Sequence, residues 1–135
     1  MSKRRHLLIL YAAAHDQTFT YNAHGDELWH GRCIHCKRQL ALSRFGKPRG
    51  GATLEHIVPK HHGGTDALDN LAIACSRCNG QKGRKIDILQ RTDPRLMKVI
   101  KTLKDRRLER RRPPPEDLPS DIHRAIQLVR ERDEH

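Results

Sequence analysis

The chain has 135 residues, a length that predicts one domain or a compact domain with extensions. Only 36% of the residues are hydrophobic and only five are aromatic, which is too little apolar material for a large core. A core this small usually needs a metal ion or disulfides to hold it together, and no stretch approaches the ~18 apolar residues of a membrane span. The formal net charge of +11 favours a polyanionic partner, most commonly nucleic acid, although ribosome-associated and membrane-surface proteins are also basic.

Residues 1–31 are expected to form an N-terminal segment that covers the core. Within them, the apolar run from Leu7 to Ala14 follows three basic residues and superficially imitates a signal peptide. His15 and Asp16 interrupt this run, and no small-residue cleavage site follows it. We therefore expect a short strand or helix that packs on the domain.

Four cysteines form two Cys-x-x-Cys pairs, Cys33/Cys36 and Cys75/Cys78. Two residues between ligands let both thiolates of a turn face one ion, and two such knuckles complete a tetrahedral zinc site. The 38 residues between the pairs exceed the usual spacing of about 15 to 20, so a folded unit must lie between them. Redox motifs or unpartnered surface thiols are the alternatives, but the short, basic chain does not suit a thioredoxin-like unit. We expect structural Zn²⁺, whose removal should unfold the domain.

Short elements are expected between and after the cysteine pairs. Glycine and proline punctuate a flexible basic loop, Pro59 would end a strand, and Ser76 is placed to cap a helix. The expected elements in chain order are a loop over 43–52, a strand over 53–58, a loop over 61–66, a short strand over 71–74 and a helix from Ser76.

Two amphipathic helices are expected beyond this core. Asp93 followed by Pro94 is a typical helix start, and a second helix should start at Ser120. Both have apolar residues spaced i, i+3, i+4, i+7, which predicts packing faces: Leu96, Val99, Ile100 and Leu103, then Ile122, Ala125, Ile126 and Val129. The arginine-rich end of the first helix, Arg106 to Arg112, is equally compatible with a solvated helix end and with a phosphate-binding strip.

The segment between the cysteine pairs carries the motif that indicates a function. It reads Leu54-Glu55-His56-Ile57-Val58-Pro59, then Gly63-Gly64-Thr65-Asp66, then Asp69-Asn70-Leu71, then Cys75-Ser76-Arg77-Cys78-Asn79-Gly80-Gln81-Lys82-Gly83. This pattern resembles the HNH endonuclease family, specifically its zinc-stapled branch, in which a ββα-metal hairpin and helix is inserted between two knuckles. The resemblance covers Cys33 to Gly83 and leaves both ends of the chain unexplained.

The resemblance implies hydrolysis of DNA phosphodiester bonds with His56 as the general base, a role that suits a side chain titrating near neutral pH. Glu55 and Asn79 would hold one catalytic divalent cation. Asn70 would tie down the loop between the strands and so orient His56. Glu55 and His56 point to opposite faces of a regular strand, so both reach one phosphate only if the strand bends or bulges, as the family hairpin does.

Two departures from the family pattern bear on the catalytic metal. Asn79 replaces the final histidine, and Glu55 stands where aspartate is common. A carboxylate and an amide oxygen form a hard site, which favours Mg²⁺ or Mn²⁺ over zinc or nickel. His61 and His62 are near enough to substitute as ligands or to contact DNA, although loop histidines are more often solvated.

Each motif residue also has an ordinary interpretation. His56 could be a buried structural histidine, Asn70 a turn residue, Glu55 a surface strand residue and Asn79 a helix-start residue. The rival function is a catalytically inactive zinc-ribbon nucleic-acid-binding module, and a structural or toxin-associated interaction protein has no positive support. A binding module, however, has no need of Glu55, His56 and Asn79 together.

We therefore expect an α+β fold with a cover segment over 1–31, an HNH nuclease core with a four-cysteine zinc site over 32–90 and a helical extension over 91–135. The expected contacts to the DNA backbone are Arg44, Lys47, Arg49, Lys60, Lys82, Arg84 and Lys85. Such contacts position a duplex without reading its bases. One active site cuts one strand, so double-strand cutting needs a homodimer or two successive events, and a partner protein could supply specificity. The resemblance implies a cytoplasmic setting in a bacterium or phage.

Overall fold

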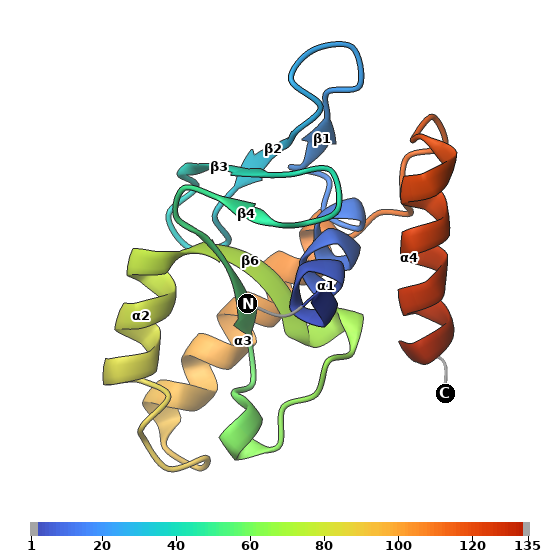
Figure 1. The fold of residues 1–135 in the computed structure, drawn as a ribbon. Helices are drawn as coiled ribbons and strands as arrows, with labels where there is room; N and C mark the ends of the chain where they lie inside the picture. Colours follow the sequence, from blue (N-terminus) through green and yellow to red (C-terminus); the bar gives the residue numbers. More distant parts are fainter. Residues whose placement is uncertain (1–2, 134–135) are drawn as a thin grey trace.

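The computed structural model, which describes residues 3–133, contains both helices and short strands (Figure 1). The outermost parts of the first and last expected segments, residues 1–2 and 134–135, lie outside the described residues. The elements are α1 (Lys3–Ala14), β1 (Thr20–Tyr21), β2 (Trp29–Arg32), β3 (Gln39–Leu42), β4 (Pro48–Arg49), β5 (Ala52–His56), η1 (Lys60–His62), η2 (Leu68–Asn70), β6 (Leu71–Cys75), α2 (Ser76–Lys85), α3 (Pro94–Arg110) and α4 (Ser120–Asp133). The mixture of helices and strands confirms the expected α+β class.

The strands form two antiparallel sheets. One sheet has the strand order β1-β2-β3-β4, and the other is a hairpin of β5 and β6. β5 pairs with β6 residue for residue, from Ala52 opposite Cys75 to His56 opposite Leu71. α2 follows β6 directly and packs on both strands of the hairpin. The predicted order of strand, loop, strand and helix is confirmed.

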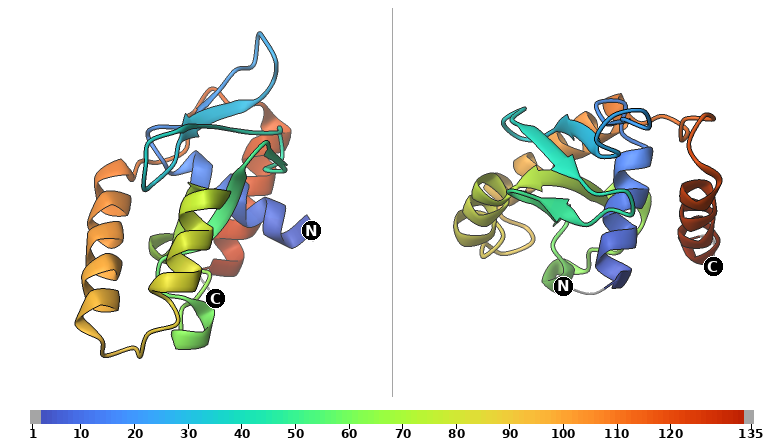
Figure 2. Two further views of the ribbon diagram at one scale, coloured as in Figure 1. Left: turned by 90° about the vertical axis from the view of Figure 1, so that its left-hand side faces the viewer. Right: turned by 45° about the horizontal axis from the view of Figure 1, so that its top comes forward.

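The apolar run near the N-terminus forms α1, in which every residue from Leu8 to Ala14 is buried. α1 contacts β5 and β6 from the side of the hairpin opposite α2, and α4 packs against α1 (Figures 1 and 2). A helix that is apolar on most sides must be covered on most sides. The run that imitates a signal peptide in the sequence is therefore part of the hydrophobic core, and no helix within residues 3–133 is long and apolar enough to cross a membrane.

The starts of α2 and α3 follow the rules of helix capping. The Asp93 side chain accepts a hydrogen bond from the Arg95 backbone N–H at 2.9 Å, and proline occupies the first turn, as predicted. α2 is capped by Cys75, whose Sγ accepts from the Cys78 N–H at 3.4 Å. The prediction of Ser76 as the cap was therefore wrong by one residue, because the sulfur of Cys75 already satisfies an amide that the helix start leaves exposed.

The apolar stripes of α3 and α4 are packing faces, as predicted. On each helix three stripe residues are buried, and the fourth is partly buried against the core. The buried residues are Leu96, Ile100 and Leu103 of α3 and Ile122, Ile126 and Val129 of α4, and the partly buried ones are Val99 and Ala125.

Two arginines at the C-terminal end of α3 are buried and bond to carbonyl oxygens inside the molecule. Arg107 is buried and donates to the His15 carbonyl oxygen at 3.1 Å. Arg110 is also buried, donates to the Cys33 carbonyl oxygen at 3.2 Å and lies 3.6 Å from the buried Asp16 carboxylate. Both sequence-based interpretations, a solvated helix end and a phosphate-binding strip, are wrong for these two residues. Guanidinium groups here satisfy carbonyl oxygens that burial removes from water.

Arg110→Met should lower the free energy of unfolding by about 3 kcal/mol, because it leaves the buried Asp16 carboxylate without its counter-charge. Arg111→Met is the matched control, since Arg111 pairs with Asp69 at 2.8 Å on the surface, where an ion pair contributes roughly 0 to 1 kcal/mol. Urea unfolding of both variants measures the difference. Equal losses in the two variants would contradict the internal role of Arg110.

Candidate functional site

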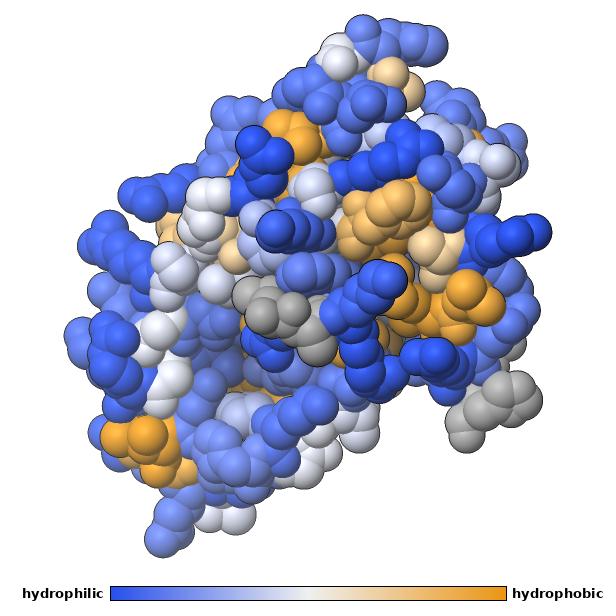
Figure 3. All heavy atoms as spheres, in the orientation of Figure 1, coloured by the Kyte–Doolittle hydropathy of each residue, from blue (hydrophilic) through white to orange (hydrophobic). Residues whose placement is uncertain are grey.

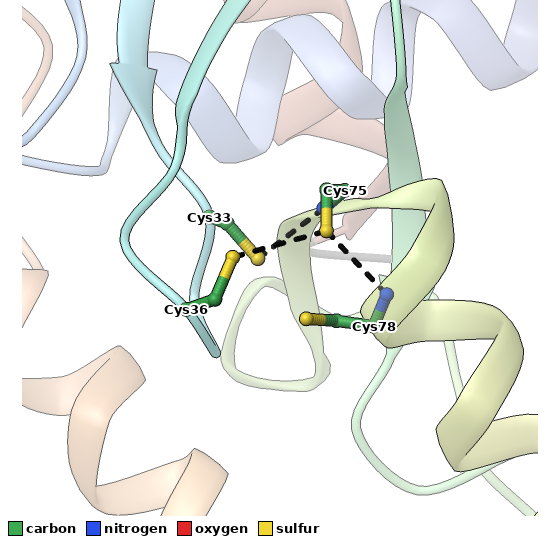
Figure 4. A group of neighbouring side chains, drawn as sticks. All are labelled: Cys33, Cys36, Cys75 and Cys78. Atoms are coloured by element: carbon green, nitrogen blue, oxygen red, sulfur yellow. Dashed lines mark hydrogen bonds between the residues drawn. The ribbon is translucent and has the colours of Figure 1, made fainter.

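The four cysteines come together in one cluster (Figure 4). Cys33 and Cys36 lie in the turn between β2 and β3, Cys75 ends β6, and Cys78 lies in the first turn of α2. Their sulfur atoms all lie within 4.8 Å of one another, and those of Cys36 and Cys75 are 3.9 Å apart. A tetrahedral zinc ion with Zn–S bonds of about 2.3 Å places its sulfurs about 3.8 Å apart. The cluster therefore fits the predicted structural Zn²⁺.

Burial and mutual contact disfavour ionisation of some of these thiols. Burial, and then hydrogen bonds to Cys75 and Cys36, raises the pKa of Cys78 to about 12, and burial also raises the pKa of Cys33. At the exposed Cys36, a hydrogen bond from the Arg38 backbone lowers the thiol pKa to about 7. A divalent cation at the centre of the cluster would offset the repulsion among four thiolates, so that all four can act as ligands.

β5 presents its two motif residues on opposite faces. The pairing with β6 is one to one through His56, and the Ile57 N–H then donates to the Asn70 carbonyl oxygen at 2.9 Å, so the ladder continues without a bulge. Glu55 consequently faces α2, whereas His56 faces α1. The regular pairing therefore excludes a bulge at Glu55 and His56. Instead, the two faces meet at the unpaired edge of β5, toward which the carbonyl groups of Leu54 and His56 point.

Glu55 is 1% exposed and is held by two basic side chains. His35 Nε2 lies 2.8 and 2.7 Å from its two carboxylate oxygens, and Lys82 Nζ lies 3.8 Å from Oε1. Burial excludes the interpretation of Glu55 as a surface strand residue. Because His35 lies between Cys33 and Cys36, the first zinc knuckle itself contacts the carboxylate.

α2 brings Asn79 and Lys82 to the same side of β5. Asn79 Nδ2 donates to Thr53 Oγ1 at 3.0 Å and to the Leu54 carbonyl oxygen at 3.1 Å, which leaves Oδ1 as the remaining polar atom of the amide. Thr53 and Glu55 are two residues apart on one strand face, so Asn79 lies beside Glu55. Lys82, one turn further along α2, is buried against Glu55. It thus lies inside the site and not on the outer surface where a DNA contact was predicted.

His56 Nε2 donates to Asp66 Oδ1 at 2.8 Å. A carboxylate only accepts, so this bond places the proton on Nε2 and leaves Nδ1 as the proton-accepting atom. The His56 side chain is 13% exposed and lines a surface cavity with Arg4, Arg5 and Lys60. Burial raises the pKa of Asp66, but hydrogen bonds from His56 and Lys60 outweigh burial, so the pKa lies below its usual value. Asp66 therefore stays ionised as the partner of His56.

Asn70 ties down the loop between the two hairpin strands. Its Oδ1 accepts from the Val58 N–H at 2.7 Å, and its Nδ2 donates to the carbonyl oxygens of Val58 at 3.0 Å and Thr65 at 2.9 Å. The last of these bonds fixes the backbone of Thr65, the residue that precedes Asp66. The buried Asn70 side chain thereby holds Asp66 against His56.

Of the remaining predicted residues, Lys60 lines the cavity of His56, and the others take no part in the contacts of the site. His61 and His62 place their Nε2 atoms 2.8 and 2.9 Å from the Asp87 carbonyl oxygen. Arg44 is half-buried and pairs with Asp121 at 2.6 Å. The exposed basic residues of the predicted DNA-contact set are Lys47, Arg49, Lys60, Arg84 and Lys85.

Two contacts of the site were not expected from the sequence. Asp66 belongs to the motif that carries the family resemblance, but it lies ten positions after His56 and no spacing rule relates the two. His35 offered one signal, a titratable side chain inside a zinc knuckle. Neither loop conformation nor strand register, which create these contacts, can be read from residue type alone.

Comparison with known families supports this grouping of site residues. Residues 33–85 match the family model described as HNH endonuclease. The match begins at Cys33 and ends with α2, so it contains both cysteine pairs, both motif residues of β5 and Asn79. The match confirms the resemblance of this segment to the HNH endonuclease family, and α1, α3 and α4 lie outside it. No curated protein and no solved structure matches the chain.

Removal of zinc should unfold the domain, so that the zinc-free protein shows no cooperative thermal transition. The reason is that zinc binding to such sites contributes roughly 10 to 16 kcal/mol. Metal analysis and a thermal melt should be run on protein before chelation, after chelation and after zinc is restored. Cys36→Ser should weaken zinc binding and lower the melting temperature, and zinc affinity should fall as the pH falls because the thiols must lose protons to bind. An unchanged melt in zinc-free protein would contradict a structural role.

Proposed function

We propose that the chain is a metal-dependent endonuclease that hydrolyses phosphodiester bonds of DNA. The observation that supports it is a grouping across β5, with His56 and Asp66 on one face and Glu55 beside Asn79 on the other. Both faces reach the same unpaired strand edge. A phosphodiester lying along this edge would meet a proton acceptor from one side and a cation site from the other.

His56 supplies the general base in this proposal. Its Nδ1 takes a proton from the attacking water, while Asp66 holds Nε2–H and stabilises the imidazolium that forms. The water oxygen forms a bond to phosphorus as the bond from phosphorus to the 3′ oxygen breaks. The 3′ oxygen takes up a proton from solvent, so the products carry a 5′ phosphate and a 3′ hydroxyl. Asn70 acts through the loop that bears Asp66 and touches no reacting atom.

Glu55 and Asn79 are the proposed ligands of Mg²⁺ or Mn²⁺. A carboxylate and an amide oxygen suit a hard cation. Asn79 bonds to β5 through Nδ2, which leaves its Oδ1 for a cation on the strand face that carries the buried Glu55 carboxylate. When bound, the cation would stabilise negative charge on the phosphate and on the departing oxygen. His35 and Lys82 hold the Glu55 carboxylate in place and balance its charge.

Basic residues at the surface are the proposed contacts to the DNA backbone. The exposed members are Lys47, Arg49, Lys60, Arg84 and Lys85, and the half-buried Arg44 would join them if its pair with Asp121 opens. Contacts of this kind position a duplex without reading its bases, and the affinity should fall steeply with salt. With one such site per chain, cutting both strands requires a second copy or a second event.

His56→Ala should reduce the single-turnover rate of DNA cleavage by about 10² to 10⁴-fold, because the variant lacks the general base. DNA binding should survive, since His56 is only slightly exposed and the exposed basic residues are unchanged. The measurement is cleavage of a short labelled duplex by zinc-loaded protein with Mg²⁺ or Mn²⁺, with binding followed on the same duplex.

His123→Ala is the control for loss of a histidine, because His123 lies on α4 and contacts the Glu116 carbonyl oxygen. It should cleave at the wild-type rate. Equal rates for His56→Ala and wild type would remove His56 from the mechanism. Binding without cleavage by the wild type would favour the inactive zinc-ribbon module.

A further inference from the structure

α1 delivers two arginines to the cavity in which His56 lies. This helix begins beside the end of β5 (Figure 1) and lies outside the matched segment 33–85. Arg4 Nη2 lies 3.2 Å from Asp66 Oδ2, and Arg5 Nη2 donates to the Leu54 carbonyl oxygen at 3.4 Å. Both arginines line the cavity together with His56 and Lys60.

Arg5 lies where the two halves of the site meet. The Leu54 carbonyl oxygen accepts from Arg5 of α1 and also from Asn79 of α2. This oxygen points to the unpaired edge of β5, between the His56 face and the Glu55 face. A guanidinium group at this atom is therefore close to both the base side and the cation side of the site.

The cavity around His56 has the charge of an anion site. Its lining carries three cations, Arg4, Arg5 and Lys60, against the single carboxylate of Asp66. That carboxylate is already engaged by His56, Arg4 and Lys60. The face of the molecule seen in Figure 3 is largely hydrophilic, with hydrophobic atoms confined to separate patches.

We propose that Arg5, assisted by Arg4 and Lys60, binds the scissile phosphate of the DNA beside His56. The guanidinium fork matches two phosphate oxygens and can bond to both at once. This inference rests on the proposed nuclease function and extends it, because a helix outside the family segment then completes the active site.

The first test measures phosphate binding without any cleavage. Inorganic phosphate is titrated into zinc-loaded protein lacking other divalent cations, and NMR follows the His56 ring and the Arg5 side chain. Saturable shifts at both groups are expected in the wild type, with at least about tenfold weaker binding in Arg5→Ala. The charge-matched control is Arg95→Ala, which removes an exposed arginine of α3 that pairs with Asp93 and should bind as the wild type does. Equal binding by Arg5→Ala and wild type, or absence of shifts in the wild type, would overturn the proposal.

The second test separates phosphate binding from a merely structural bond to Leu54. At saturating DNA, Arg5→Ala should lower the cleavage rate constant by about 10²-fold, and Arg5→Lys should recover part of it because the charge remains without the fork. Arg5→Gln keeps a donor without the charge, so it should stay slow while its melting temperature stays near the wild-type value. Wild-type rates in Arg5→Gln would contradict the proposal. If the wild type itself does not cleave, the nuclease proposal fails, and the phosphate titration still decides whether the cavity binds an anion.

Discussion

The cross-link through four cysteines is the constraint on which the rest of the structure depends. It joins the turn after β2 to the start of α2, two segments that 38 residues separate. The binding energy of structural zinc, roughly 10 to 16 kcal/mol, is comparable to the whole net stability of a typical domain, about 5 to 15 kcal/mol. The same cluster caps α2 through Cys75, and Asn79 directly follows Cys78. A metal ion held by this cluster would therefore stabilise the fold and also set the position of the proposed catalytic-cation ligand.

The zinc site and the candidate active site share a side chain. His35 belongs to the first knuckle by position and to the active site by contact, because its Nε2 lies within hydrogen-bond distance of both Glu55 oxygens. A buried carboxylate needs such partners, since an ionised group without them is expensive to remove from water. Loss of zinc would thus release both α2 and the contact that holds Glu55, so stability and activity should be lost together.

Positive charge serves two separate purposes in this chain. Arg107 and Arg110 are buried and bind carbonyl oxygens of distant segments, so they hold α3 on the core. Arg4, Arg5 and Lys60 instead surround the cavity of His56. The net charge of +11 therefore includes basic residues that are buried and that DNA could not contact. Burial distinguishes the arginines that hold the fold together from those at the surface.

Local patterns predicted much of the fold. Asp93 and Pro94 marked the start of α3, the apolar spacing identified the packing faces of α3 and α4, and two Cys-x-x-Cys pairs identified the metal cluster. These predictions depend on neighbouring residues or on a strict ligand geometry. The regular strand at Glu55 and His56 was not predicted, because it depends on pairing with β6.

Contacts between distant segments could not be predicted in the same way. The bonds of His35 to Glu55, of Asp66 to His56 and of Arg5 to Leu54 join residues 20, 10 and 49 positions apart. Each arises from tertiary packing, for which the residue types set no distance. The motif residues of the candidate site were therefore accessible from sequence, whereas the side chains that surround and orient them required the structure.

The proposed function requires that residues 33–85 cleave DNA by means of a cation other than the ion expected at the four cysteines. The most direct test is incubation of supercoiled plasmid with zinc-loaded wild-type protein in Mg²⁺, in Mn²⁺ and in a weak chelator that leaves the zinc in place, as checked by metal analysis. We expect nicked or linear DNA with either cation and intact plasmid with the chelator. Plasmid that is bound but stays intact in every condition would contradict this expectation.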